Sequence, residues 1–159
     1  MTRALVLAVV ASVVLPFTAR AQSKPDFSGT WTLDTARSDA PLGRGGRGGR
    51  GGGTGPATIV QDAASLKITR GEQTLTYKLD GSESTNQVMG RGGAQEVKSK
   101  VRWDGAKLVI ETTRDFQGMS ITTKETRSLS PDSKEMTVET AATTPQGERN
   151  SKQVFTKGS

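Results

Sequence analysis

Residues 96–114 read EVKSKVRWDGAKLVIETTR and carry the pattern that decides the fold class. In the first half, Val97, Val101 and Trp103 share one face of an extended segment, and basic residues occupy the other face. This period of two is typical of a half-buried strand. Asp104-Gly105 then predicts a two-residue hairpin turn, because glycine accepts a positive φ without steric cost. The stretch therefore predicts two antiparallel strands.

The same alternation recurs on both sides of this hairpin. From residue 56 onward, short alternating segments are separated by Gly, Pro, Asp and Ser, and no segment after residue 21 has a convincing helical period. We therefore predict an all-β fold, an antiparallel up-and-down meander of about nine strands. Each strand has one apolar face, so we expect the meander to close into a small barrel, which also removes the sheet edges.

The first residues predict export. Arg3 is followed by an apolar run from Ala4 to Leu15, and Ala19-Arg20-Ala21 supplies the small residues that a signal peptidase reads. The apolar run is shorter than the roughly 20 residues of a membrane-spanning helix. We expect residues 1–21 to be a cleaved signal peptide and residues 22–159 to form one barrel domain without a transmembrane segment. The mature protein is expected to be periplasmic or secreted.

Two residue types are missing, because the chain has no histidine and no cysteine. Their absence removes the His- and Cys-based nucleophiles and nearly all zinc sites. The acids Asp115, Glu125 and Glu135 are not paired at a defined separation, as glycoside hydrolysis would require. We therefore expect no enzymatic activity, no cofactor and no metal site.

Residues 43–55 read GRGGRGGRGGGTG and interrupt the strand pattern. Glycine at this density cannot offset its backbone entropy by burial, so we expect a disordered insertion at about residues 38–56. Arg44, Arg47 and Arg50 could reach phosphate or sulfate oxygens from such a flexible chain. Two interpretations stay open, a weak polyanion-binding arm and a solvated linker that keeps the chain soluble. Neither predicts specific nucleic-acid binding.

Phe27-Ser28-Gly29-Thr30-Trp31 resembles the start of calycin barrels, the lipocalins and fatty-acid-binding proteins, whose first strand begins with Gly-x-Trp. Residues 97–109 look like the central hairpins of the fatty-acid-binding proteins, and residues 153–157 are similar to their last strand. The resemblance implies a small calycin-like barrel. In that barrel Trp31 plugs one end, and Gly29 leaves room for it.

The resemblance further implies a barrel that binds a small apolar molecule non-covalently. Aromatic, methionine and amide side chains are the candidates to line such a cavity: Tyr77, Trp103, Met119, Met136, Gln153 and Phe155. In an alternative interpretation these side chains fill the barrel, which then serves as a scaffold for the Gly/Arg arm.

Two departures from the fatty-acid-binding proteins bear on the ligand. An Arg-x-Tyr pair in their last strand receives the ligand carboxylate, and the matching positions here hold Gln153 and Phe155. A neutral amide cannot make the charge-assisted bidentate bond of an arginine. The Gly/Arg insertion also stands where the helical lid of that family would follow the first strand.

The leader generates a first test. Mature protein isolated from the organism that makes it should begin at Gln22 or within one or two residues of it, because the small residues before that position direct cleavage. N-terminal sequencing measures this directly. Intact Met1 on membrane-bound protein would contradict the predicted cleavage.

Overall fold

The computed structural model describes residues 24–39, 55–90, 93–116, 118–144 and 147–158. These residues form ten strands, slightly more than the predicted number: β1 Gly29–Leu33, β2 Ala57–Gln61, β3 Ser65–Arg70, β4 Gln73–Lys78, β5 Ser84–Gly90, β6 Gly93–Asp104, β7 Lys107–Phe116, β8 Met119–Leu129, β9 Glu135–Thr144 and β10 Gly147–Lys157. None of the described segments is a helix long and apolar enough to cross a membrane.

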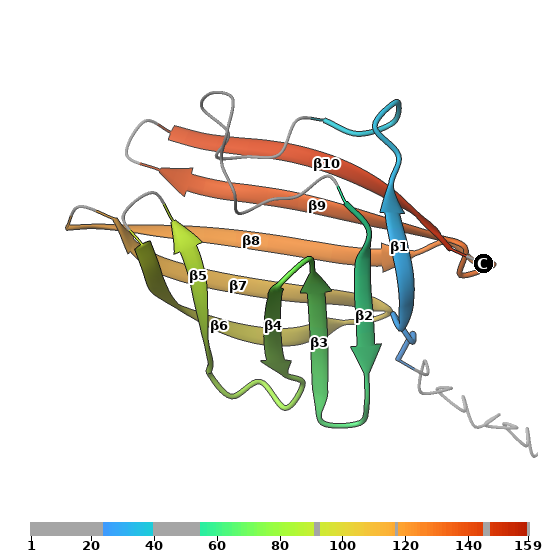
Figure 1. Cartoon of the computed structure of the whole chain (residues 1–159), viewed down its shortest axis with the longest axis horizontal. Coiled ribbons are helices and arrows are strands. Elements are labelled where there is room, and N and C mark those ends of the chain that lie inside the picture. The colour runs from blue at the N-terminus through green and yellow to red at the C-terminus, as the bar shows by residue number, and fades with distance from the viewer. Residues whose placement is uncertain (1–23, 40–54, 91–92, 117, 145–146, 159) are drawn as a thin grey trace, which may run out of the picture.

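The strands form one antiparallel sheet in the order β4-β3-β2-β1-β10-β9-β8-β7-β6-β5. Strands that follow one another in the chain pair with each other, apart from β4 and β5, which stand at the two ends of the order. In addition, β1 pairs with β10. In Figure 1 the short strands β1 to β4 stand across the longer strands β7 to β10. The predicted all-β, up-and-down meander in a small, nearly closed barrel is confirmed.

The apolar core fills the end of the barrel at which the β6–β7 and β8–β9 turns lie. Trp31 is completely buried there, and its indole Nε1 donates a hydrogen bond of 2.9 Å to the carbonyl oxygen of Phe27. The ring centroid of Phe27 lies 6.2 Å from that of Trp103. Leu108 and Met136, each next to a hairpin turn, are also fully buried. This end is therefore packed with side chains.

Gly29 lies directly beneath the side chain of Lys157. A Cβ atom on Gly29 would lie 2.5 Å from Cε of Lys157, and the φ of Gly29 is +137°, which disfavours other residues. The Nζ atom of Lys157 lies 5.4 Å from the ring centroid of Trp31. Gly29 thus admits the lysine that covers Trp31, and its predicted role of leaving room for Trp31 itself stays a prediction.

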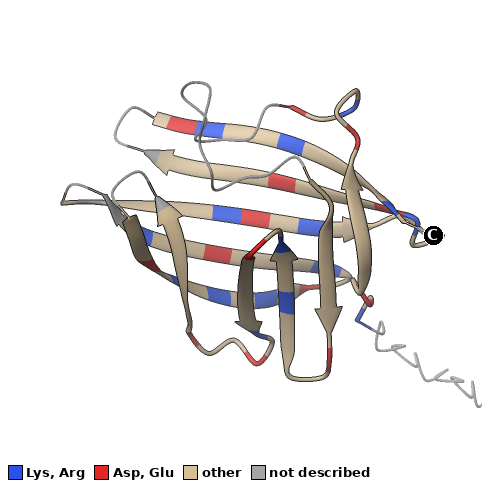
Figure 2. Cartoon of the chain, in the orientation of Figure 1, with Lys and Arg blue, Asp and Glu red and all other residues tan. Residues whose placement is uncertain are grey.

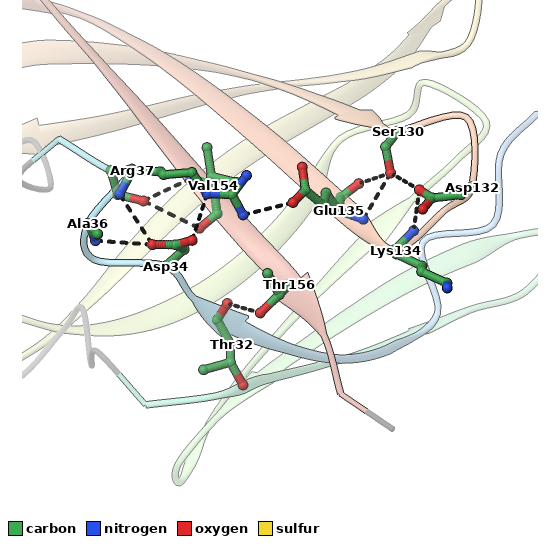
Figure 3. Close-up of polar contacts among 11 residues, drawn as sticks. Thr32, Asp34, Ala36, Arg37, Ser130, Asp132, Lys134, Glu135, Val154 and Thr156 are labelled. Atoms are coloured by element: carbon green, nitrogen blue, oxygen red, sulfur yellow. Dashed lines mark hydrogen bonds and ion pairs between the residues drawn. The ribbon is translucent and has the colours of Figure 1, made fainter.

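The segment after β1 remains attached to β9 and β10 through side chains (Figure 3). Arg37 donates to Asp34 at 2.6 Å and to Glu135 at 2.7 Å. The Oγ atom of Ser38 accepts a hydrogen bond of 2.9 Å from the backbone amide of Val154. These contacts hold the chain against the barrel wall up to the start of the predicted insertion.

Side chains also close the seam between β4 and β5, where no backbone ladder forms. The side-chain amide of Asn86 donates to the carbonyl oxygen of Thr76 at 3.0 Å and accepts from its N–H at 2.8 Å. The Oγ atom of Ser84 accepts a 2.8 Å hydrogen bond from the backbone amide of Lys78. Asn86 therefore takes the place of a peptide group, and the two edges meet without direct pairing.

The seam generates a second test. Asn86→Ala leaves both backbone groups of Thr76 without their partner, and we expect it to lower the free energy of unfolding by about 1–3 kcal/mol. Chemical denaturation measures the change. The neighbouring, exposed Thr85→Ala is the matched control and should change stability by less than about 0.5 kcal/mol. Equal stability of the two variants would show that Asn86 does not close the barrel.

Candidate functional site

A charged pair on β8 has its arginine inside the apolar core. Arg127 is only 4% exposed, and the strand register sets it between Leu108 of β7 and Val138 of β9, both core residues. Its Nη2 atom donates a hydrogen bond of 2.6 Å to Oε2 of Glu125, two residues earlier on the same face of the strand. The core thus contains a guanidinium group between leucine and valine side chains, paired with a half-buried carboxylate.

A second arginine reaches the same interior from the other side of the barrel. Arg70, the last residue of β3, holds its guanidinium carbon 5.4 Å from the ring centroid of Phe155. Burial lowers the pKa of Arg70, the positive charge of Arg127 lowers it further, and Glu125 and Tyr77 oppose the change. We call Arg70, Tyr77, Glu125 and Arg127 the interior charged cluster.

The interior charged cluster has two guanidinium groups but only one carboxylate, and several of its N–H donors have no acceptor in the described part of the chain. Nε and Nη1 of Arg127 and Nε of Arg70 are buried without a hydrogen-bond partner among the described residues. A buried unsatisfied donor costs about 1–3 kcal/mol, and more when it is charged. Two guanidinium groups face one carboxylate, so the cluster is suited to accept the oxygens of a carboxylate or sulfonate.

The register sets two predicted cavity residues beside this cluster. Trp103 and Gln153 lie in the same row across the sheet as Arg127, through Leu108 on one side and Val138 on the other. Among the other candidates, Tyr77 belongs to the cluster, Phe155 lies beneath Arg70, and Met136 is fully buried at the packed end of the barrel. The side chain of Met119 lies outside the described part of the structure.

Sequence reasoning missed Arg70 and Arg127, and it considered Glu125 only as a catalytic acid. The signal was present in the alternation. Counting in steps of two from Leu129 sets Arg127 and Glu125 on its face, and counting forward from Leu66 and Ile68 reaches Arg70. Charged residues at inward positions of a strand are uncommon unless they are paired or functional.

The described residues of the outer wall form no comparable cluster of buried charged groups. Lys98 and Arg102 pair with Glu83 and Glu111 at 3.3 and 3.8 Å, and Figure 2 shows both signs of charge interspersed along the strands. A surface groove of about 410 Å³ is lined by both signs as well, from Asp39, Lys124, Glu139 and Lys152. The described residues include no group of three or more acids that could hold a metal ion.

The predicted anion-binding arginines of the insertion are Arg44, Arg47 and Arg50. They lie outside the described residues, which resume only at residue 55. Their role therefore stays a prediction.

Tyr77 generates a third test, because it is the only tyrosine in the chain. Burial raises its pKa from 10.0 to about 12, and the negative charge of Glu125 adds to the rise. The neutral form is favoured in the folded state, so the stability that Tyr77 contributes is present below about pH 10 and is lost as the pH rises toward 12. Tyrosinate absorbance should titrate near 12 in folded protein and near 10 in denaturant. A midpoint near 10 in protein that remains folded by circular dichroism would remove Tyr77 from the interior.

A comparison with solved structures supports the fold. No family model and no curated protein sequence matches the chain. The crystal structure of zebrafish ileal bile acid-binding protein in complex with cholic acid is similar, with a TM-score of 0.50 at 17% sequence identity. The match covers 83% of this chain and 98% of that one. The chain therefore has the calycin-like barrel fold of the fatty-acid- and bile-acid-binding proteins.

Proposed function

We propose that this protein binds a small amphipathic molecule non-covalently inside the barrel, with the acidic group of the ligand held by the interior charged cluster. The observation that carries the proposal is the buried guanidinium of Arg127. No described residue accepts a hydrogen bond from two of its nitrogen atoms, Nε and Nη1. A folded chain retains such a group at a cost in stability, and an anionic ligand removes that cost.

The surroundings of Arg127 support an apolar body for the ligand. Leu108, Ile110 and Val138 flank the charged pair, and each is at most 3% exposed. Binding sites for small molecules commonly combine such apolar walls with a few polar groups that fix orientation. The bile acid in the similar zebrafish structure is an amphipathic acid of this general kind.

The proposed role is binding rather than catalysis, in an exported protein. The chain has neither histidine nor cysteine, and Glu125 is engaged by Arg127. The secretory leader predicted for residues 1–21 supports a periplasmic or extracellular location. The competing role, a filled scaffold with a polyanion-binding arm, stays open for the Gly/Arg insertion.

Two matched dyes test the proposal. 8-Anilinonaphthalene-1-sulfonate carries a sulfonate, and N-phenyl-1-naphthylamine has the same ring system without it. Fluorescence titration should show tighter binding of the sulfonate dye to the wild type. Arg127→Met should weaken the binding of the sulfonate dye about tenfold or more, the value of a hydrogen bond to a charged group, and change the neutral dye far less.

Lys124→Met is the control, because Lys124 lies on the same strand with its side chain exposed on the outer wall. It should leave both affinities unchanged. If the wild type binds neither dye, or if Arg127→Met and Lys124→Met behave alike, the interior is not the binding site.

A further inference from the structure

We infer that Glu125 sets the charge of the ligand, so that the interior selects molecules with a single negative charge over neutral molecules and over dianions. The inference rests on the proposed function and deepens it. It makes Glu125 a specificity-determining residue, because its carboxylate neutralises one of the two guanidinium groups that face the interior.

The charge count covers the interior charged cluster alone, because Arg114 and Arg149, which the register also sets at inward positions, are exposed to solvent. Arg127 and Arg70 each carry one positive charge, and Glu125 binds Arg127 through a hydrogen bond of 2.6 Å. Three guanidinium nitrogens are still buried and without partners, on both arginines. The interior charged cluster therefore has one uncompensated positive charge, together with unpartnered donors on two strands, β3 and β8.

Burial makes this count decisive. Arg127 is 4% exposed between Leu108 and Val138, so water cannot screen a residual charge there as it does at the surface. A neutral molecule leaves the positive charge uncompensated. A dianion replaces it with an uncompensated negative charge beside Glu125. Only a monoanion brings the buried site to neutrality.

Glu125 can act in this way because it shares the site with the ligand. Its side chain is 34% exposed, against 5% for the side chain of Arg127, so it lies on the more open side of the pair. The register sets it between Ile110 and Thr140, one row from Arg127. A ligand that binds the free nitrogens of Arg127 therefore lies near the carboxylate, where a second negative charge is repelled.

Three molecules with one tail test the inference: decyl sulfate, decyl phosphate and decanol. At a pH of about 8.5 the phosphate is a dianion, because its second pKa is about 6, and the sulfate is a monoanion. Isothermal calorimetry on the wild type should show decyl sulfate binding about tenfold or more tightly than the other two. Glu125→Gln should reverse the order of sulfate and phosphate, because two positive charges then remain.

Two further variants test the count itself, and circular dichroism verifies that each is folded. Arg70→Gln brings the cluster to neutrality and should abolish the preference of sulfate over decanol. Arg70→Gln combined with Glu125→Gln leaves one positive charge, so the sulfate preference should return. Glu111→Gln is the matched control, since Glu111 is paired with Arg102 on the outer wall and should leave the wild-type order unchanged.

The outcomes separate this inference from the proposed function. If Glu125→Gln and the double variant bind these molecules with the wild-type order, the charge count is wrong while interior binding stands. If Arg70→Gln alone retains the sulfate preference, Arg70 does not belong to the site and the count is also wrong. If the wild type binds none of the three, interior binding itself fails. A reversal in Glu125→Gln with recovery in the double variant supports the inference.

Discussion

Every backbone amide and carbonyl inside this barrel must find a partner, and the place where this is hardest is the seam between β4 and β5. Elsewhere the neighbouring strands satisfy one another through regular antiparallel pairing. At the seam the side chains of Ser84 and Asn86 take over that task for Lys78 and Thr76. Closure of the barrel at this seam therefore depends on polar side chains. A regular backbone ladder between β4 and β5 would not require them.

Burying the charged cluster opposes the stability of the same fold. An ion pair among leucine and valine side chains loses more hydration than a surface pair, and replacing such pairs by apolar residues is often stabilising. The packed end around Trp31 supplies the compensating burial, because aromatic and aliphatic side chains fill it completely. The apolar core thus supplies the burial that offsets the cost of its unsatisfied donors, which include Nε1 of Trp103 as well as the guanidinium nitrogens of Arg70 and Arg127.

Much of the fold follows from the alternation of residues 96–114 and its repeats, because a half-buried strand has a period of two. The strand count fell short where the inner residues are polar. β5 turns Ser84 and Asn86 inward, so Val88 is the one apolar residue on that face and the alternation is hard to recognise. Side-chain spacing could have revealed Arg127, whereas its position between Leu108 and Val138 depends on registers between strands, which a single sequence does not fix.

The departure at the last strand has a physical counterpart elsewhere in the barrel. Gln153 and Phe155 are uncharged, but Gln153 lies in the row of Arg127 and Phe155 lies beneath Arg70. The barrel therefore has positive charge near Gln153 and Phe155. This charge comes from Arg70 on β3 and Arg127 on β8 rather than from β10.

This placement also connects the cluster to the seam. Tyr77, a member of the cluster, lies between Thr76 and Lys78, the two residues of β4 that Asn86 and Ser84 hold. An acid bound between Arg70 and Arg127 would draw together strands from opposite sides of the barrel, at the level where β4, paired with β3 on one edge, meets β5 on the other edge only through side chains. The interior charged cluster and the seam are therefore neighbours on β4, where Tyr77 stands between the two residues that the seam side chains hold.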